Sequence, residues 1–130
     1  MSAPEAAGLM EAGRLVLLDI RSPQEWEESG VARGALPISM HEPDFPKRLQ
    51  EVLSRVPPER VGLICATGGR SNYVAEILEK NGVTGVVDIS EGMFGNGKSP
   101  GWIARGLPVV RAREALDTYT LWRLSEIKAD

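Results

Sequence analysis

Short apolar segments alternate along this chain with segments of helical periodicity, and this alternation limits the fold more than any other feature. Four β-prone segments occupy residues 14–20, 35–40, 61–65 and 84–89, and LPVV at residues 107–110 is expected to close the core. Segments of helical pattern lie between them. Strands joined by helical crossovers form mainly parallel sheets. The sequence therefore predicts an α/β fold with a mainly parallel sheet.

Three of the predicted helices have recognisable starts. Ser22 and Glu25 form a capping box around a proline at the first helical position. Asp44 is expected to cap the second helix, and Ser71 is expected to open the third. A further helix is expected in the tail at residues 113–130. Its expected contact residues are Leu116, Tyr119, Trp122 and Ile127.

Length, composition and charge limit the possible functions. The 130 residues fit one domain, with an expected core over about residues 14–110 and a helical tail that packs on it. Hydrophobic residues make up 42% and charged residues 25%, which excludes extensive disorder. The net charge of −3 argues against a nucleic-acid partner, and no apolar run approaches the ~20 residues that span a bilayer. The single cysteine, Cys65, excludes an internal disulfide and favours a reducing cytoplasm.

The most informative segment is VGLICATGGRS at residues 61–71. Cys65 ends a predicted buried strand, and in open α/β sheets ligands bind beyond the carboxyl ends of the strands. Gly68 and Gly69 allow the backbone to curl so that successive N–H groups face an anion, while the helix start and Arg70 add positive charge. These features favour the thiolate form of Cys65 over the thiol. The pattern predicts a nucleophilic cysteine with an anionic covalent intermediate.

Four other interpretations of this segment compete with a nucleophilic cysteine. A buried structural cysteine at a strand end is the simplest alternative. A nucleotide-binding P-loop needs G-x-x-x-x-G-K-[ST], which is absent, and one cysteine with one histidine cannot complete a four-ligand zinc site. A papain-like mechanism needs a histidine base, and His41 is the only histidine in the chain. We expect His41 to cap a turn in the polar stretch at residues 41–44.

Three motifs, in order, resemble those of the single-domain rhodanese family of sulfurtransferases. The motifs are LLDIRSPQEWEESGVARGALPI, CATGGRS and GMFGNGKSPGWIARGLPVV, and the resemblance runs from about residue 15 to residue 110. It implies a twisted parallel sheet of five strands flanked by helices. It also implies that Cys65 accepts a sulfane sulfur and becomes a persulfide. Residues 30–35 lack the histidine that often stands in the first motif, which marks a divergent branch and leaves the catalytic residues untouched.

The same resemblance assigns roles to individual residues. Cys65 would be the nucleophile. The residues that would cradle its persulfide are Ala66, Thr67, Gly68, Gly69 and Arg70. Asp19 and Arg21 would support the fold and the wall of the site rather than take part in catalysis. Trp102 and Phe94 would help to build the rim of the pocket.

The implied reaction is a sulfur transfer in two steps, with no metal and no organic cofactor. Cys65 would take the outer sulfur of thiosulfate or of a persulfide donor, and cyanide or a thiol, on a small molecule or a protein, would remove it. Two alternatives stay open: a non-catalytic or regulatory rhodanese-like binding module, and a phosphatase or arsenate reductase of the same fold. Relatives that process oxyanions have a loop one residue longer, whereas the segment from Cys65 to Arg70 has the sulfur-transfer length.

Overall fold

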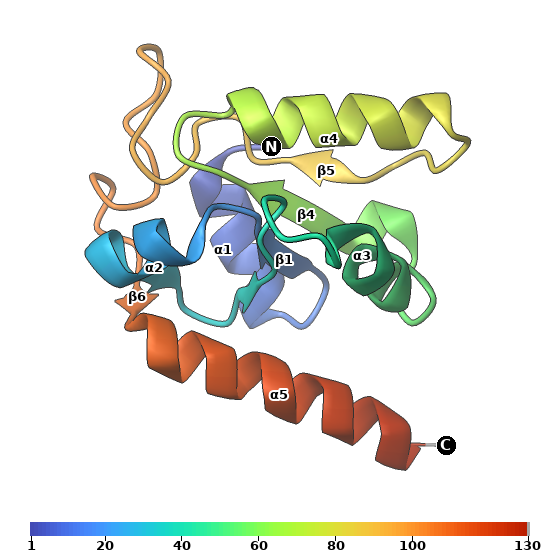
Figure 1. Cartoon of the computed structure of the whole chain (residues 1–130). Helices are drawn as coiled ribbons and strands as arrows, with labels where there is room; N and C mark the ends of the chain where they lie inside the picture. The colour runs from blue at the N-terminus through green and yellow to red at the C-terminus, as the bar shows by residue number, and fades with distance from the viewer. Residues whose placement is uncertain (130) are drawn as a thin grey trace.

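In the computed structural model, a parallel sheet of four strands forms the centre of the molecule (Figure 1). The structure describes residues 1–129, with side chains up to residue 125. In sheet order the strands are β3 (Leu36–Pro37), β1 (Val16–Asp19), β4 (Val61–Ile64) and β5 (Val87–Asp88). Leu18 of β1 lies in register with Leu36 on one side and with Leu63 on the other. The predicted α/β class is confirmed.

The segment at residues 107–110 does not add a fifth strand to this sheet, although the family resemblance implies five. Its β6 (Val109–Val110) pairs antiparallel with β2 (Val31–Ala32) in a separate sheet of two strands. Pro108 has no N–H to donate, which suits a short edge pairing better than a central strand. Among the described residues, the parallel sheet therefore has four strands.

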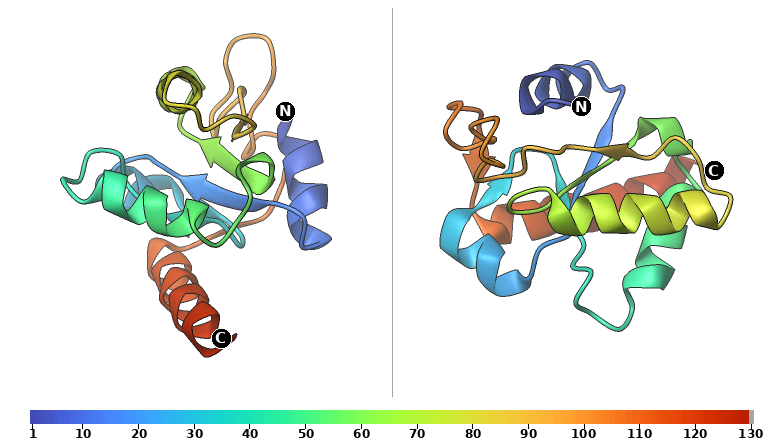
Figure 2. Two further views of the ribbon diagram at one scale, coloured as in Figure 1. Left: turned by 90° about the vertical axis from the view of Figure 1, so that its right-hand side faces the viewer. Right: turned by 90° about the horizontal axis from the view of Figure 1, so that it is seen from above.

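Helices cover both faces of the sheet, and a separate hydrophobic core lies on each face (Figures 1 and 2). The first core includes residues of α1 (Ala3–Glu11), α2 (Pro23–Ser29) and the start of α5 (Ala112–Ala129). The second includes residues of α3 (Phe45–Leu53) and α4 (Gly69–Lys80). Because side chains alternate along a strand, Leu17 serves the first core and Leu18 the second. With both faces covered, the strand ends are where a site can form.

Two capping boxes start helices on the first face. The box predicted at the start of α2 is confirmed: Ser22 Oγ accepts from the Glu25 N–H at 3.3 Å, and Glu25 Oε1 accepts from the Ser22 N–H at 3.1 Å. Ser2 and Glu5 form the second box, which starts α1. The sequence-based prediction does not include α1, whose only buried residues are the alanines at positions 3 and 6, so its apolar pattern is weak.

The starts of α3 and α4 differ from the prediction. Asp44 holds the N-cap position of α3 but makes no capping hydrogen bond, because its carboxylate pairs with Arg48 at 2.6 Å. Helix α4 begins at Gly69 rather than at Ser71, since Gly68 adopts a φ of +97° and occupies the N-cap position. The first turn of α4 therefore lies inside the loop of residues 65–70, the cysteine loop. The free N–H groups of that turn are available in the loop.

The carboxyl-terminal helix α5 packs on its own chain, mainly against β3. Tyr119 is buried in the second core, and the guanidinium groups of Arg48 and Arg123 each lie 5.6 Å from its ring centre. Leu116 is more exposed than predicted, at 42%, and the side chain of Ile127 lies outside the described residues. No helix in the described part of the chain is long and apolar enough to cross a membrane.

Candidate active site

Cys65 lies directly after β4, at the carboxyl edge of the parallel sheet, with only 1% of its surface exposed. Two main-chain N–H groups point at its sulfur: that of Gly68 at 3.1 Å and that of Ser71 at 3.4 Å. Both groups belong to the cap and first turn of α4, where the helix dipole is positive. The arrangement stabilises negative charge on Sγ, as the sequence pattern predicts.

Close backbone packing explains why glycine occupies two positions around this loop. A Cβ on Gly68 would overlap the main-chain oxygen of Ser90, and a Cβ on Gly92 would overlap that of Ala66. The oxygens of Cys65 and Ala66 accept from the N–H groups of residues 93 and 94, each at 2.9 Å. The long loop of residues 91–106 is therefore fastened along the cysteine loop, and it holds the loop backbone in place.

Arg70 lies in the site but is already paired. Its Nη1 and Nη2 donate to the two carboxylate oxygens of Glu25 at 2.7 and 2.8 Å, and Nη1 is also 3.1 Å from His41 Nε2. The hydrogen bonds from Arg70 lower the pKa of Glu25 to about 2. The hydrogen bonds to Glu25 in turn raise the pKa of Arg70, and the charge of Cys65 makes a smaller contribution in the same direction. Arg70 thus contributes positive charge to the site, but Glu25 neutralises most of it.

The other predicted cradle residues lie along the loop without a side-chain contact to the sulfur among the described residues. Ala66 is half-buried and contributes the main-chain oxygen described above. Thr67 and Gly69 are exposed. His41 lies in a turn, but the ring is not seen to cap it: its contact is with Arg70, and its main-chain N–H donates to Ser39 Oγ.

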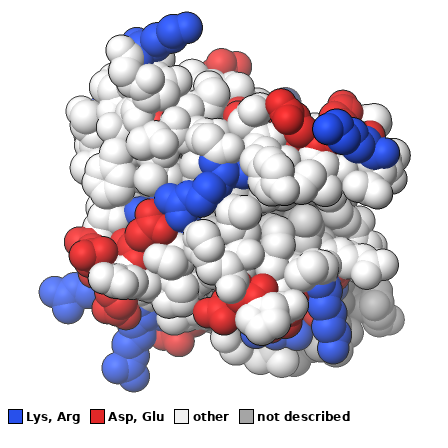
Figure 3. Space-filling view, turned by 45° about the horizontal axis from the view of Figure 1, so that its top comes forward, with Lys and Arg blue, Asp and Glu red and all other residues white. Residues whose placement is uncertain are grey.

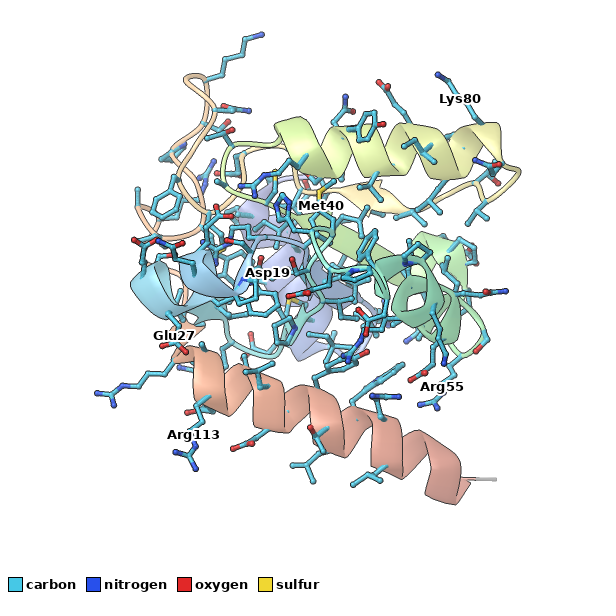
Figure 4. All side chains as sticks on the ribbon, in the orientation of Figure 1. Asp19, Glu27, Met40, Arg55, Lys80 and Arg113 are labelled. Carbon is cyan, nitrogen blue, oxygen red and sulfur yellow. The ribbon has the colours of Figure 1, made fainter. Side chains whose placement is uncertain are left out.

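Asp19 and Arg21 form a fully buried ion pair behind the site. Arg21 Nη2 donates to Asp19 at 2.8 Å and to the Gly30 oxygen at 2.7 Å, and Arg21 Nη1 donates to Ser29 Oγ at 2.7 Å. The pair therefore ties the end of β1 to the end of α2. In Figure 4, Asp19 lies in the interior, whereas Lys80 and Arg113 point outward. This placement fits the supporting role that the family resemblance implies.

The two aromatic residues expected at the pocket rim lie in different environments. Phe94 is 55% exposed, which is compatible with a place at the rim of the expected pocket. Trp102 is not at a rim, because it is 1% exposed in the first core and its Nε1 donates to the Pro108 oxygen at 2.9 Å. The apolar residues of the glycine-rich segment 91–106 indicate an ordered loop, and in the structure this segment contributes Trp102 to the first core.

Ser71 and Asp88 complete the immediate surroundings of the sulfur, and neither is predicted as a site residue. Ser71 Oγ lies 3.4 Å from Cys65 Sγ and 2.5 Å from Asp88 Oδ1. Ser71 is predicted only as a helix start, and Asp88 only as part of a strand. The pairing of β4 with β5 brings Asp88 beside the loop, and this contact between distant segments leaves no local signal in the sequence.

Glu91, which helps to hold the long loop against the site, is a third residue that the sequence-based prediction does not include. Its carboxylate accepts from the Ala3 N–H at 2.7 Å, the Gly101 N–H at 2.9 Å and Arg105 Nε at 2.6 Å. Burial alone would raise the pKa of Glu91, but these hydrogen bonds outweigh burial and the pKa lies below its usual range. Glu91 thus joins α1 to both ends of the long loop.

Charge on the outer surface is mixed. On the face shown in Figure 3, basic and acidic side chains lie beside one another, without a broad patch of one sign. A nucleic-acid partner would need such a basic patch. Among the side chains that the structure describes, no group of three or more His, Cys, Asp or Glu could hold a metal ion.

Comparison with known proteins places this site in context. A family model described as a rhodanese-like domain matches residues 2–96. The structure of Rv0390 from M. tuberculosis is 28% identical over 86% of this chain and 96% of that chain, with a TM-score of 0.59. The human single-domain sulfurtransferase TSTD1 is 28% identical over 71% of this chain and 88% of that chain, with a TM-score of 0.55.

A third solved structure bears on the alternative activity. RPA3614 from Rhodopseudomonas palustris, described as a protein of unknown function and possible tyrosine phosphatase, is 25% identical over 84% of this chain and 82% of that chain, with a TM-score of 0.56. No curated protein matches the sequence.

Proposed function

The chain belongs to the family of rhodanese-like domains, and on that basis we propose that it is a sulfurtransferase that carries a sulfane sulfur on Cys65. The observation that carries the proposal is the pair of N–H groups, from Gly68 and Ser71, that point at Sγ at 3.1 and 3.4 Å. These donors suit a charged sulfur, and a persulfide is anionic near neutral pH. A purely structural cysteine has no need of them.

The proposed reaction has two displacements. The Cys65 thiolate attacks the outer sulfur of thiosulfate or of a persulfide donor, and the new S–S bond forms as the old bond to the leaving group breaks. Sulfite, or the donor thiolate, leaves with the electron pair. Cyanide or a thiol then attacks the terminal sulfur, and the Cys65 thiolate leaves in turn. The chemistry needs no metal and no organic cofactor.

The partners in this proposal are small sulfur anions or persulfides as donors and a thiol, small or protein-borne, as acceptor. The cradle residues proposed are Ala66, Thr67, Gly68, Gly69 and Arg70. A single reactive thiol of this kind suits a reducing compartment, for which we propose the cytoplasm. The packing of α5 on β3 supports the proposal that residues 1–130 form one domain.

The test is the mass of the intact protein after incubation with thiosulfate. We expect a gain of one sulfur atom, which cyanide then removes. Cys65→Ser should gain no mass and should lose thiosulfate:cyanide activity, because serine is nearly isosteric but far less readily ionised. An unchanged melting temperature for the variant shows that the fold is intact. Retention of most of the activity in Cys65→Ser would contradict the assignment.

A phosphatase or arsenate reductase is the competing proposal, and the likeness to RPA3614 is the observation that favours it. The loop argues against it, since a phosphoryl group needs a wider ring of N–H groups than a sulfur atom does. We expect no hydrolysis of an aryl phosphate by the unmodified protein. Hydrolysis that is lost in Cys65→Ser would replace the sulfur-transfer proposal. Absence of both activities in the unmodified, folded protein would favour the regulatory binding module.

A further inference from the structure

One hydroxyl group links the reactive sulfur to a carboxylate. Ser71 Oγ lies 3.4 Å from Cys65 Sγ, 2.5 Å from Asp88 Oδ1 and 3.2 Å from the Gly68 oxygen. Ser71 is fully buried, and Cys65 is nearly so. Asp88 is only half-buried, so the carboxylate lies closer to solvent, whereas the protons of the buried hydroxyl and thiol can be counted.

In the thiol form this count is balanced. The Cys65 S–H donates to Ser71 Oγ, and the Ser71 hydroxyl donates to the Asp88 carboxylate, which is the closest of its acceptors. Once Cys65 is a thiolate or a persulfide anion, it has no proton to donate. The single hydroxyl proton of Ser71 then faces two anions. The sulfur keeps the N–H groups of Gly68 and Ser71 as donors, but either the sulfur or Asp88 must give up the Ser71 hydroxyl as a donor, and the lost hydrogen bond is costly. The conflict disappears if Asp88 carries a proton.

We propose, on the basis of the persulfide function above, that Asp88 takes up a proton when Cys65 becomes anionic, and that Ser71 relays it. The Ser71 proton moves to Asp88 Oδ1 while the Cys65 proton moves to Ser71 Oγ. No proton is lost or gained in this step. Afterwards the Asp88 O–H donates to Ser71 Oγ, and the Ser71 hydroxyl donates to the sulfur anion. Asp88 acts through Ser71 and does not touch the reacting sulfur.

The charges around this link are consistent with a carboxyl group that can be protonated. Burial raises the pKa of Asp88, against smaller lowering contributions from the Ser71 hydrogen bond and from the amino-terminal ammonium, which donates to the Asp88 main-chain oxygen at 3.1 Å. From α4, the nearest full charge toward the sulfur is Arg70, and Glu25 largely neutralises it. A second negative charge beside the sulfur anion would thus be poorly compensated.

The test is the pH profile of Cys65 alkylation by iodoacetamide, followed by intact mass. Asp88→Asn mimics the protonated carboxyl, because its amide can donate to Ser71 Oγ and leave the hydroxyl proton for the sulfur. We expect the profile to move to lower pH, with about tenfold more reactive thiolate at a fixed pH below the midpoint. Asp117→Asn, on the exposed side of α5, is the matched control and should leave the profile unchanged. An unchanged profile for Asp88→Asn would overturn the proposal.

A second pair of variants separates the relay from simple charge repulsion. In a Ser71→Ala background the relay is absent, so Asp88→Asn should no longer move the profile. A shift of equal size with and without the Ser71 hydroxyl would mean that Asp88 acts through space, and would overturn the relay. The alkylation assay uses no sulfur donor, so this result is independent of whether a persulfide forms with thiosulfate.

A measurement on the unmodified protein covers the case in which a variant fails to fold. With carboxyl-labelled aspartate, the ¹³C resonance of Asp88 should titrate in two steps, and the second step should coincide with ionisation of Cys65. A single step with no inflection at the thiol midpoint would contradict the proposal.

Discussion

At the scale of single residues, the Glu25–Arg70 pair determines how much positive charge the site offers to an anionic donor. Glu25→Gln keeps the capping function for α2 but removes the negative charge beside Arg70. We expect the KM for dianionic thiosulfate to fall several-fold, with a smaller change in kcat, because Arg70 is then uncompensated. Asp44→Asn, which releases Arg48 from a similar but exposed pair, is the control and should leave KM unchanged.

Glu25→Gln should also change how the free energy of unfolding depends on pH. The pKa of Glu25 falls from 4.5 in a free side chain to about 2 in the folded protein, so its stabilising contribution is present above pH 4.5 and is lost as the pH falls toward 2. Both side chains are about 30% exposed, so screening limits this contribution to about 1–2 kcal/mol. The free energies of unfolding of the unmodified protein and of Glu25→Gln, measured with urea, should differ by this amount at pH 7 and become equal near pH 2. A difference in unfolding free energy that stays constant from pH 7 to pH 2 would contradict a stabilising contribution from the Glu25–Arg70 ion pair.

At the scale of elements, the start of α4 inside the cysteine loop depends on Gly68. Its φ is +97° and a Cβ would overlap Ser90, so Gly68→Ala should cost at least about 1–3 kcal/mol of unfolding free energy and displace the N–H that faces Sγ. The rate of sulfur transfer should fall as well, because this N–H group no longer faces the sulfur. Gly69→Ala is the matched control, since it lies in the helix with open space around it, and it should be neutral or stabilising by up to about 1 kcal/mol. Urea unfolding and thiosulfate:cyanide assays check both variants, and equal behaviour would contradict the proposed cap.

Elements with local signals could be predicted, and elements that depend on distant partners could not. The capping box at Ser22 and the apolar segment before Cys65 are readable because their causes lie within a few residues. The curl at Gly68 is readable from its glycine, but the close approach of Ser90, which excludes a Cβ at that position, is not, because Ser90 is distant in the sequence. Asp88 reaches Ser71 only through the pairing of β4 with β5, and no spacing in the sequence encodes that contact.

At the scale of the whole molecule, α5 extends beyond residues 2–96, which the family model matches, yet it contributes to the second core. Tyr119→Ala should therefore lower the free energy of unfolding by about 3 kcal/mol, since a buried ring is removed. Leu121→Ala, at a position 66% exposed, should change it by less than about 0.5 kcal/mol. Activity per folded molecule should stay the same in both variants. Equal stabilities, measured by urea unfolding, would mean that α5 does not belong to the folded domain.

The three hydrogen bonds of Glu91 also impose an order on the maturation of the protein during synthesis. The chain is synthesised amino end first, so Cys65 is incorporated before Gly101 and Arg105. Until they are added, the Glu91 carboxylate lacks two of its three partners, and the loop that holds the main chain of Cys65 and Ala66 lacks its anchor to Glu91. We therefore expect the backbone around Cys65 to take its final arrangement only when residues up to 105 are free to fold.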